Sequence, residues 1–421
     1  MQGAAVRTRN WAGNITFSAS AVHRPTSVEQ LQGLVAGAGR VRALGSGHSF
    51  SPVADTDGEL VRLDGLPRVL EVDTAARTVT VGGGLTYGDV APALHAAGLA
   101  LPSMGSLPHI SVAGASATGT HGSGSANQVL AASVVALELV TADGSLLELS
   151  READPHRFPG AVVAMGTLGV VTRLTLAAVS GFEIAQEVRE RLPLAALLAH
   201  VDDVLSAGYS VSVFTDWTEP VEAAVWLKRT PDATPPPPDW LGSIVADGPR
   251  HPVPGMPTHH STEQMGSVGP WHERLPHFRM EFTPSNGDEL QTEYLLPRSC
   301  AAAALAAVAE LAPLIAPVLQ IGELRTVAAD DLWLSSAYDR DSLAVHFTWI
   351  PDMAAVSPVL KAVEAALAPF EPRPHWGKVF DIDPAVVASR YPRLPDFRTL
   401  RDELDPGRRF ANGFVDRYLG P

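Results

Sequence analysis

The strongest constraint on this chain is a short loop near its start that combines glycine, serine and histidine. The loop spans Leu44 to Phe50, reads Leu-Gly-Ser-Gly-His-Ser-Phe, and follows an apolar-basic run at 41–43 that predicts a strand. Glycines and serines in such a turn can bring bare backbone N–H groups and hydroxyls against a diphosphate. His48 has no role in an ordinary phosphate loop, but it can bond covalently to a cofactor held there. The alternative is a surface turn with a solvated histidine.

A second segment of similar composition lies at residues 103–124. It reads Ser-Met-Gly-Ser-Leu-Pro-His-Ile-Ser-Val-Ala-Gly-Ala-Ser-Ala-Thr-Gly-Thr-His-Gly-Ser-Gly, so small and hydroxyl residues dominate. A backbone with so few large side chains can approach a ligand closely. Neither segment is a Gly-x-Gly-x-x-Gly that opens a long helix or a Gly-x-x-x-x-Gly-Lys-Ser/Thr. This argues against a Rossmann site and against a P-loop nucleotidase.

Composition excludes several classes of function. The 421 residues are 46% apolar and 18% charged, which is enough for two or three domains with a large core. The net charge of −15, with no basic cluster, argues against a nucleic-acid partner. Cys300 is the one cysteine, so no intrachain disulfide forms, and its alanine-rich surroundings predict a buried, inert thiol. The histidine pair at 259–260 has no carboxylate at metal-ligand spacing, so we expect no metal site.

The sequence carries no pattern typical of a secretory signal or a membrane span. Residues 1–7 lead into polar positions without an apolar core region. The longest apolar stretch, residues 300–319, is mostly alanine and is interrupted by Glu310 and two prolines, which favours a buried helix. We therefore expect a cytoplasmic protein with no membrane partner.

Local patterns predict an α+β fold. Capping signals at Thr26 and Thr86 open two helices, the second ended by Gly98. In the first block, which ends at about residue 180, we expect strands at 41–44, 59–63, 68–72, 78–82, 136–140, 146–149 and 170–176. From about residue 181 the strands lengthen, and we expect them at 209–216, 223–228, 318–326 and 343–350, with helices at 299–312 and 355–369. Helices and strands mix without strict β-α-β repetition, which favours α+β over a doubly wound sheet.

Two of the later strands carry polar residues on one face. Because alternate residues of a strand share a face, Glu323 and Arg325 lie together, and so do His346 and Thr348. A carboxylate beside a guanidinium can hold a polyol by complementary hydrogen bonds, and a polar pair between apolar neighbours suggests a buried hydrogen-bonding wall. The alternatives are a surface ion pair and a structural histidine.

Two further positions suggest chemistry. Lys378 lies in His-Trp-Gly-Lys, where the glycine permits a turn that aims the ammonium; near Arg325, both burial and a like charge would disfavour its charged form. Such a lysine can stabilise a developing alkoxide, although an exposed turn lysine is the alternative. In the second glycine-rich segment, the Ser106 hydroxyl can contact both a cofactor and a substrate, and Gly105 leaves space beside it.

These motifs together resemble the vanillyl-alcohol-oxidase-type FAD flavoproteins. The likeness is strongest to the alditol oxidases (xylitol or sorbitol oxidases) and next to the aldonolactone oxidases, and it covers most of the chain. It is carried by both glycine-rich segments and by Asn10–Asn14, residues 101–111, Gly269–Arg274, Glu323–Thr326, His346–Trp349 and His375–Lys378.

The resemblance implies a two-domain fold with a PCMH-like FAD-binding domain at 1–180. A substrate-binding cap domain with a large antiparallel sheet follows at 181–374, and a C-terminal segment, 375–421, returns to the FAD domain. The implied cofactor is FAD, bonded through its 8α-methyl group to His48. The implied FAD-binding residues are Arg42, Gly45, Ser46, Gly47, His48, Ser49, Phe50, Ser106, Ser111, Gly114, Thr118, Gly119, Thr120, His121, Val170 and His375.

The implied reaction is oxidation of the terminal primary hydroxyl of an alditol to the aldose, with O2 reduced to H2O2. Arg325 and Lys378 would act on the reacting hydroxyl, and Ser106, Glu323, His346 and Thr348 would hold the others. Gly105 favours an oxidase, because bulk near this position restricts oxygen access in the family. The expected partners are a small polyol and O2, with the chain a monomer. An aldonolactone oxidase, an FAD-dependent dehydrogenase with another acceptor and a non-catalytic carbohydrate-binding protein are the alternatives.

Overall fold

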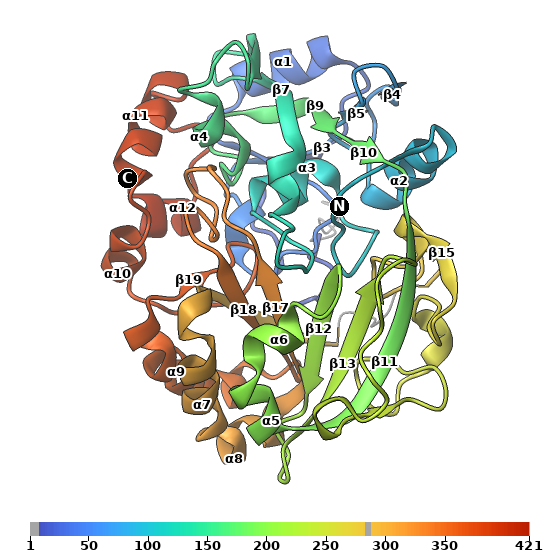
Figure 1. The fold of residues 1–421 in the computed structure, drawn as a ribbon. Helices are drawn as coiled ribbons and strands as arrows, with labels where there is room; N and C mark the ends of the chain where they lie inside the picture. The colour runs from blue at the N-terminus through green and yellow to red at the C-terminus, as the bar shows by residue number, and fades with distance from the viewer. Residues whose placement is uncertain (1–7, 283–287, 421) are drawn as a thin grey trace, which may run out of the picture.

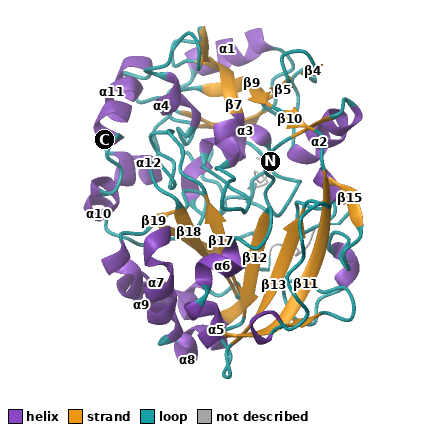
Figure 2. Ribbon diagram, viewed as in Figure 1, coloured by secondary structure: helices purple, strands orange, loops and turns teal. Residues whose placement is uncertain are grey.

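Two β-sheets at opposite ends of the molecule carry most of its strands (Figure 1). The computed structural model describes residues 8–282 and 288–420; residues 1–7, on which the expectation of no secretory signal was based, lie outside the described part. Figure 2 shows that loops make up most of the region between the two sheets. The two glycine-rich segments of the sequence belong to this region.

The sheet of the first block has five antiparallel strands. Its order is β4 (Leu70–Asp73), β5 (Thr78–Gly82), β9 (Val170–Ala177), β7 (Val134–Val140) and β8 (Leu146–Ser150). A second, parallel sheet joins β1 (Ala21–His23), β3 (Glu59–Arg62) and β2 (Val41–Leu44), and β6 (Leu99–Ala100) pairs with β10 (Val179–Ser180). Every strand predicted for this block is confirmed to within about two residues, the usual uncertainty of element ends.

The helices of this block are α1 (Val28–Gly37), α2 (Tyr87–Ala96), α3 (Val112–Ala117) and α4 (Phe158–Val162). The two predicted capped helices are confirmed, although the N-cap of α1 is Ser27 and not Thr26 as predicted. The Ser27 hydroxyl accepts a hydrogen bond from the Gln30 amide at the start of α1. At the start of α2, Thr86 and Asp89 form a reciprocal capping box. These caps satisfy amide groups that have no partner within the helix.

The sheet of the second block, which begins at about residue 181, is large and antiparallel throughout, as the fold prediction requires. Its order is β14 (Ile244–Val245), β11 (Glu183–Pro193), β13 (Glu222–Arg229), β12 (Ser210–Thr215), β17 (Leu319–Val327), β18 (Ser342–Trp349), β16 (Leu290–Pro297) and β19 (Arg373–Pro374), and β15 (Val268–Pro270) also pairs with β11. The two strands that carry the predicted polar pairs, β17 and β18, are therefore hydrogen-bonded neighbours.

One side of the large sheet is core, and the helices of the second block pack on it. These are α5 (Leu194–Ala199), α6 (Val201–Leu205), α7 (Ala301–Ala309), α8 (Ala312–Ile315) and α9 (Met353–Leu367). Val345, Phe347 and Trp349 of β18 are fully buried in the same hydrophobic core as α7 and α9. The core extends without a break into the first block, so the two blocks share one apolar interior.

Two helical stretches of the second block are apolar enough to merit inspection as membrane spans. Met353–Phe370 is long and apolar enough to cross a membrane. Its buried residues, however, recur every three or four positions, which is the pattern of a helix packed on a core. Arg298–Ala309 and Ala312–Val318 are long and apolar enough to cross a membrane only when taken together, and the two helices are bent by 63° at the break between them. The single helix predicted over 299–312 is thus broken before α8, and Cys300 is half-buried, not buried as predicted.

The C-terminal segment runs along the side of the first block as α10 (Pro384–Ser389), α11 (Leu394–Leu404) and α12 (Gly413–Leu419) (Figure 1). Asn412 joins this segment to the first block by hydrogen bonds. Its amide nitrogen donates to the carbonyls of Pro52, Val53 and Asp55 at 2.8–3.2 Å, and its oxygen accepts from Val415 N–H, which caps α12. The loop that precedes α12 is therefore fixed to the segment that follows the His48 loop.

Asn412→Ala should destabilise the protein strongly. It removes a helix cap and leaves buried carbonyls without their donor, so we expect a loss of about 3 kcal/mol in the free energy of unfolding. Asp383→Ala, at the exposed N-cap of α10, is the matched control and should cost about 1 kcal/mol. Urea unfolding of the three proteins measures both values. Equal losses would show that the three carbonyl contacts add nothing.

Candidate active site

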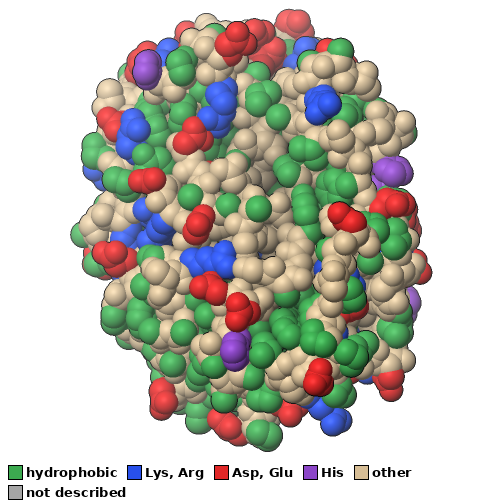
Figure 3. All heavy atoms as spheres, in the orientation of Figure 1, with side chains coloured by type: hydrophobic (Ala, Val, Ile, Leu, Met, Phe, Trp, Pro, Cys, Tyr) green, Lys and Arg blue, Asp and Glu red, His purple; other side chains and the backbone are tan. Residues whose placement is uncertain are grey.

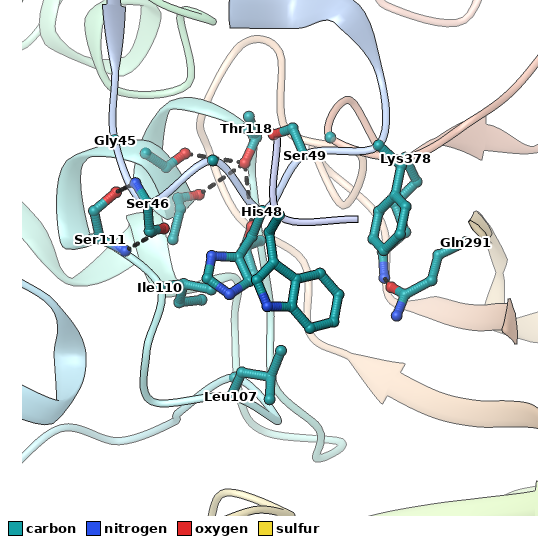
Figure 4. Close-up of a pocket in the computed structure, with 18 of the residues that line it drawn as sticks. Gly45, Ser46, His48, Ser49, Leu107, Ile110, Ser111, Thr118, Gln291 and Lys378 are labelled. Atoms are coloured by element: carbon teal, nitrogen blue, oxygen red, sulfur yellow. Dashed lines mark hydrogen bonds between the residues drawn. The ribbon is translucent and has the colours of Figure 1, made fainter. Parts of the chain in front are cut away.

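A cavity of about 470 Å³ lies between the first block and the large sheet. One arm is lined by the loops at 42–54 and 105–121, and the other by the polar face of β16, β17 and β18 together with Lys378. Figure 4 shows the two arms from one side, with Ser46 and Ser111 at one end and Lys378 directed at Gln291 at the other. Both glycine-rich segments and both predicted polar pairs thus line one space.

The two glycine-rich loops are bound to each other. The Ser111 amide donates to the Ser46 hydroxyl at 3.1 Å, and the Ser46 amide donates to the Ser111 hydroxyl at 3.4 Å. A Cβ at Gly45 would lie 2.3 Å from the Ser111 hydroxyl oxygen, so this close approach requires glycine. Gly47 has a φ of +73°, a left-handed conformation that also favours glycine. The glycines and serines of these loops therefore allow the two backbones to approach each other closely.

The motif Asn-Trp-Ala-Gly-Asn holds the His48 loop in place. Asn10 donates to the Ser49 carbonyl and Asn14 donates to the Phe50 carbonyl, each at 3.0 Å. The Trp11 ring stacks on His48 with centroids 5.1 Å apart. The motif carried the resemblance, but nothing in the sequence indicated that it contacts this loop.

His48 lines the cavity as a neutral side chain. Burial, reinforced by His109, lowers the pKa of His48 to about 4. Its Nδ1 is buried and has no hydrogen-bond partner in the described part of the chain. Unpartnered buried polar atoms are rare in folded proteins, so this nitrogen points to a ligand at the site.

Most of the predicted cofactor-binding residues line the cavity. They are Arg42, Gly45, Ser46, Gly47, His48, Ser49, Phe50, Ser106, Ser111, Gly114, Thr118, Thr120, His121 and His375. Gly119 and Val170 do not, contrary to the expectation. Val170 points to the opposite side of β9 and packs in a core cluster with Leu31 and Val35, while its neighbours Gly169 and Val171 line the cavity.

Arg42 is committed to the protein backbone. Its two terminal nitrogens donate to four carbonyls, those of Val53, Met165, Gly166 and Phe410. Burial lowers the pKa of Arg42 to about 10. The side chain thus joins β2 to the 165–166 turn and to the C-terminal segment, a role that sequence reasoning did not assign to it.

Strand register assembles the polar wall at the other end of the cavity. Glu323 of β17 and Glu293 of β16 both lie opposite His346 of β18, and Gln291 lies opposite Thr348. All five side chains therefore share the cavity face of the sheet. Glu293 and Gln291 were missed from the sequence. The signal was weak, because Gln291, Thr292 and Glu293 are three polar residues in a row and do not show the alternation seen in β18.

Glu293 lies at the centre of the charged groups. Its Oε1 is 2.5 Å from an Arg325 terminal nitrogen and 3.2 Å from His121 Nε2, and its Oε2 is 3.6 Å from Lys378 Nζ. Burial acts to raise the pKa of Glu293, but Arg325, His121 and Lys378 together hold it well below its ordinary value. The carboxylate is therefore ionised, and it holds the two cations of the wall side by side.

The pKa of Lys378 is lowered, first by burial and then by Arg325, while Glu293 opposes the shift. This is the electrostatic setting that the sequence suggested for a desolvated lysine beside Arg325. Lys378 Nζ also donates to the Gln291 side-chain oxygen. Burial likewise lowers the pKa of His375 to about 3, and Gly377 N–H donates to its Nδ1 at 3.0 Å, which leaves the proton of the neutral ring on Nε2.

His346 and Ser106 complete the wall. Both ring nitrogens of His346 are buried without a hydrogen-bond partner among the described residues, and its Nδ1 is 4.0 Å from Glu323 Oε2. The Ser106 hydroxyl accepts from Arg325 at 3.4 Å, and Gly105 lines the cavity next to it. The wall therefore offers free donors and acceptors beside a buried cation pair, which suits a ligand that carries several hydroxyl groups.

Comparison with known proteins identifies the two halves of the chain. Residues 19–150 match a family described as FAD binding domain, and residues 288–418 match a family described as D-arabinono-1,4-lactone oxidase. The chain is 33% identical to an L-gulono-1,4-lactone dehydrogenase of Mycobacterium tuberculosis, over 98% of this chain and 99% of that protein. Cholesterol oxidase of Brevibacterium sterolicum has the same fold, with a TM-score of 0.78 and 15% identity over 98% of this chain and 96% of that one.

Another relative is much more similar. An alditol oxidase of Streptomyces sp. is 54% identical over 97% of this chain and 98% of its own length. A match at this identity over both blocks includes the cofactor loops and the polar wall alike. The chain belongs to the alditol oxidase family of vanillyl-alcohol-oxidase-type FAD flavoproteins.

Proposed function

We propose that this chain is an FAD-dependent alditol oxidase that converts the terminal primary hydroxyl of alditols such as xylitol and sorbitol to the aldose and reduces O2 to H2O2. The observation that carries the proposal is the pair of buried cations, Arg325 and Lys378, held by Glu293 next to the unpartnered polar groups of the wall. The high identity to an alditol oxidase over nearly the whole chain supports the same substrate class.

The residues of the cavity fit FAD. The arm between the first-block loops is lined by glycines, hydroxyls and His48, whose Nδ1 has no hydrogen-bond partner among the described residues. When bound, FAD supplies the hydride acceptor and the path of electrons to oxygen. We assign cofactor binding to the residues predicted from the sequence that line the cavity, with His375 close to the reactive ring. In domain terms, residues 1–180 and 375–421 form the FAD-binding part and residues 181–374 the substrate-binding part.

We further propose that the cofactor is bonded to His48 through its 8α-methyl group. The low pKa of His48 keeps its ring neutral, so that a nitrogen lone pair is available for the bond. Stacking on Trp11 restricts the orientation of the ring. The loop is in turn held by Asn10 and Asn14, so the nitrogen is presented in one place.

The polar wall orients the substrate. Glu323 accepts hydrogen bonds from hydroxyl groups, while His346, Thr348 and Ser106 offer both donors and acceptors. These contacts place the C1 hydroxyl beside Arg325 and Lys378, whose charges stabilise the developing alkoxide in a site shielded from water. In its neutral form, Lys378 Nζ accepts the C1 hydroxyl proton, and the lowering of its pKa by burial and by Arg325 favours that form.

The remaining partners follow from charge and surface. Acidic and basic side chains are interspersed over the face shown in Figure 3, and the net charge is −15, which supports a protein without a nucleic-acid partner. We propose that the enzyme acts in the cytoplasm as a monomer, without a membrane partner. Its proposed partners are then a small polyol and O2.

The substrate proposal predicts a clear preference among alcohols. Purified, flavin-loaded protein should release H2O2 with xylitol and sorbitol, and at least about tenfold more slowly with gulono- or galactono-1,4-lactone, because the wall matches an open chain of hydroxyls. A peroxide-coupled assay measures both. A preference for the lactone would favour the aldonolactone oxidase that the 288–418 match and the Mycobacterium relative suggest. Turnover with a quinone but not with O2 would indicate a dehydrogenase.

The covalent bond predicts that flavin fluorescence stays with the polypeptide on a denaturing gel. His48→Ala should abolish this fluorescent band, because the bonding nitrogen is gone, while His109→Ala, a nearby histidine, should retain it. Flavin that remains attached in His48→Ala would assign the bond to another residue. A wild-type band without fluorescence would show that FAD is bound non-covalently.

The charge cluster predicts how activity depends on pH. If neutral Lys378 accepts the proton, kcat/KM for xylitol rises as pH increases through the lowered pKa of Lys378. Glu293 acts to raise that pKa, so Glu293→Gln should move the rising limb to lower pH. Lys378→Met should remove the limb and reduce kcat/KM by about 100- to 10,000-fold. A limb that moves to higher pH in Glu293→Gln, or that survives in Lys378→Met, would exclude Lys378 as the group that titrates.

A further inference from the structure

From Glu323 a chain of buried polar groups runs through His277, which also lines the cavity, into the large sheet. His277 Nε2 is 2.9 Å from Glu323 Oε1, and His277 Nδ1 is 3.1 Å from Lys228 Nζ. Lys228 is 1% exposed and His277 is 5% exposed. No motif in the sequence pointed to either residue, and neither has a part in the proposed chemistry.

Strand pairing and one covering loop bring the three residues together. Ser210 of β12 lies opposite Lys228 of β13, and Phe214, on the same face of β12, lies opposite Glu323 of β17. Lys228 and Glu323 therefore share the inner face of the sheet. His277 enters between them from the loop after Leu275, where its ring packs edge-on against Phe214 and Trp226. Its backbone N–H donates to the Ser106 carbonyl at 3.1 Å, so the loop also supports Ser106.

The hydrogen bonds of Lys228 determine which nitrogen of His277 carries the proton. Three acceptors surround Lys228 Nζ: the carbonyls of Leu275 and Pro276, and His277 Nδ1. An ammonium group has three donors, one for each acceptor. When Lys228 is an ammonium, His277 Nδ1 accepts, so Nε2 carries the ring proton and donates it to Glu323, whose ionised carboxylate can only accept. Burial and Lys228 lower the pKa of His277 to about 4, so the ring is neutral, while burial lowers the pKa of Lys228 to about 7.

The contact with His277 leaves the second oxygen of Glu323 for substrate. Oε1 accepts the hydrogen bond from His277 Nε2–H and lies 3.5 Å from Arg325 Nε. Oε2 faces the unpartnered His346 ring at 4.0 Å, too far for a hydrogen bond. Without the His277 donor, Glu323 is free to turn both oxygens toward Arg325, which would close the acceptor position that faces the cavity.

We infer that Lys228 and His277 are positioning residues: Lys228 fixes the tautomer of His277, and His277 holds Glu323 with one carboxylate oxygen directed at a hydroxyl of the polyol. The inference rests on the proposed function, which places Glu323 in contact with substrate. It assigns part of the specificity of the wall to Lys228, which does not line the cavity, and to the hydrogen bond that His277 makes to Glu323.

Steady-state kinetics on flavin-loaded variants test the chain of contacts. His277→Phe keeps a flat ring but removes the donor, and should raise KM for xylitol about 10- to 100-fold with kcat changed by less than about threefold. Lys228→Met should raise KM in the same way. Because both act through one hydrogen bond to Glu323, the double variant should match His277→Phe alone.

His277→Gln provides the conservative control. Its amide N–H can donate to Glu323 without a tautomer to fix, so it should restore KM to within about threefold of wild type, and Lys228→Met should then have little further effect. A crystal structure of His277→Phe should show Glu323 turned toward Arg325, a result that needs no turnover. If His277→Phe fails to fold, Lys228→Met and its combination with His277→Gln decide the question.

Three results would overturn the inference. They are an unchanged KM in His277→Phe or Lys228→Met, effects of the two single variants that multiply in the double variant, and a Glu323 carboxylate that stays in place in the His277→Phe crystal. A wild-type protein that oxidises no alditol is a separate result, because it contradicts the proposed function while the crystal comparison still tests the positioning.

Discussion

The site depends on one buried carboxylate. Glu293, with its side chain 1% exposed, holds Arg325 and Lys378 on its two oxygens in a part of the protein from which water is largely excluded. Two cations so close together would repel each other strongly at low dielectric, and removing one member of such a buried cluster typically costs about 3–5 kcal/mol. Glu293 makes their proximity stable while leaving both N–H groups near the cavity. Register places it there, because β16, β18 and β17 lie side by side.

Local chemistry in the sequence was sufficient to predict most strands of the first block, four strands of the large sheet and much of the wall, but not β11 or β16. Period-two alternation put Glu323 with Arg325 and His346 with Thr348, because the face of a strand residue follows from its position alone. Capping residues predicted α1 and α2, two of the four helices described in the first block, because the hydrogen bonds of a cap lie within one turn. The motifs that carried the family resemblance supplied the cofactor and the reaction, which no local pattern contains.

What the sequence did not reveal is set by contacts between distant residues. That β17 and β18 are neighbours, and that Glu293 faces both, depends on register across a sheet, which no single strand specifies. His277 was missed because a loop inserts it between Lys228 and Glu323 from outside the strands. Gly119 and Val170 are predicted cofactor residues that do not line the cavity. Val170 points to the other side of β9, whereas no side-chain direction applies to Gly119.

The central claim is that the reacting hydroxyl lies between the two cations held by Glu293. A crystal structure of the flavin-loaded enzyme with xylitol, under anaerobic conditions, tests this most directly. The account predicts that the C1 oxygen lies within hydrogen-bond distance of both Lys378 Nζ and an Arg325 nitrogen, with another hydroxyl on Glu323 Oε2. A polyol bound with its C1 oxygen away from both cations, or an Arg325 side chain turned out of the cavity, would contradict it.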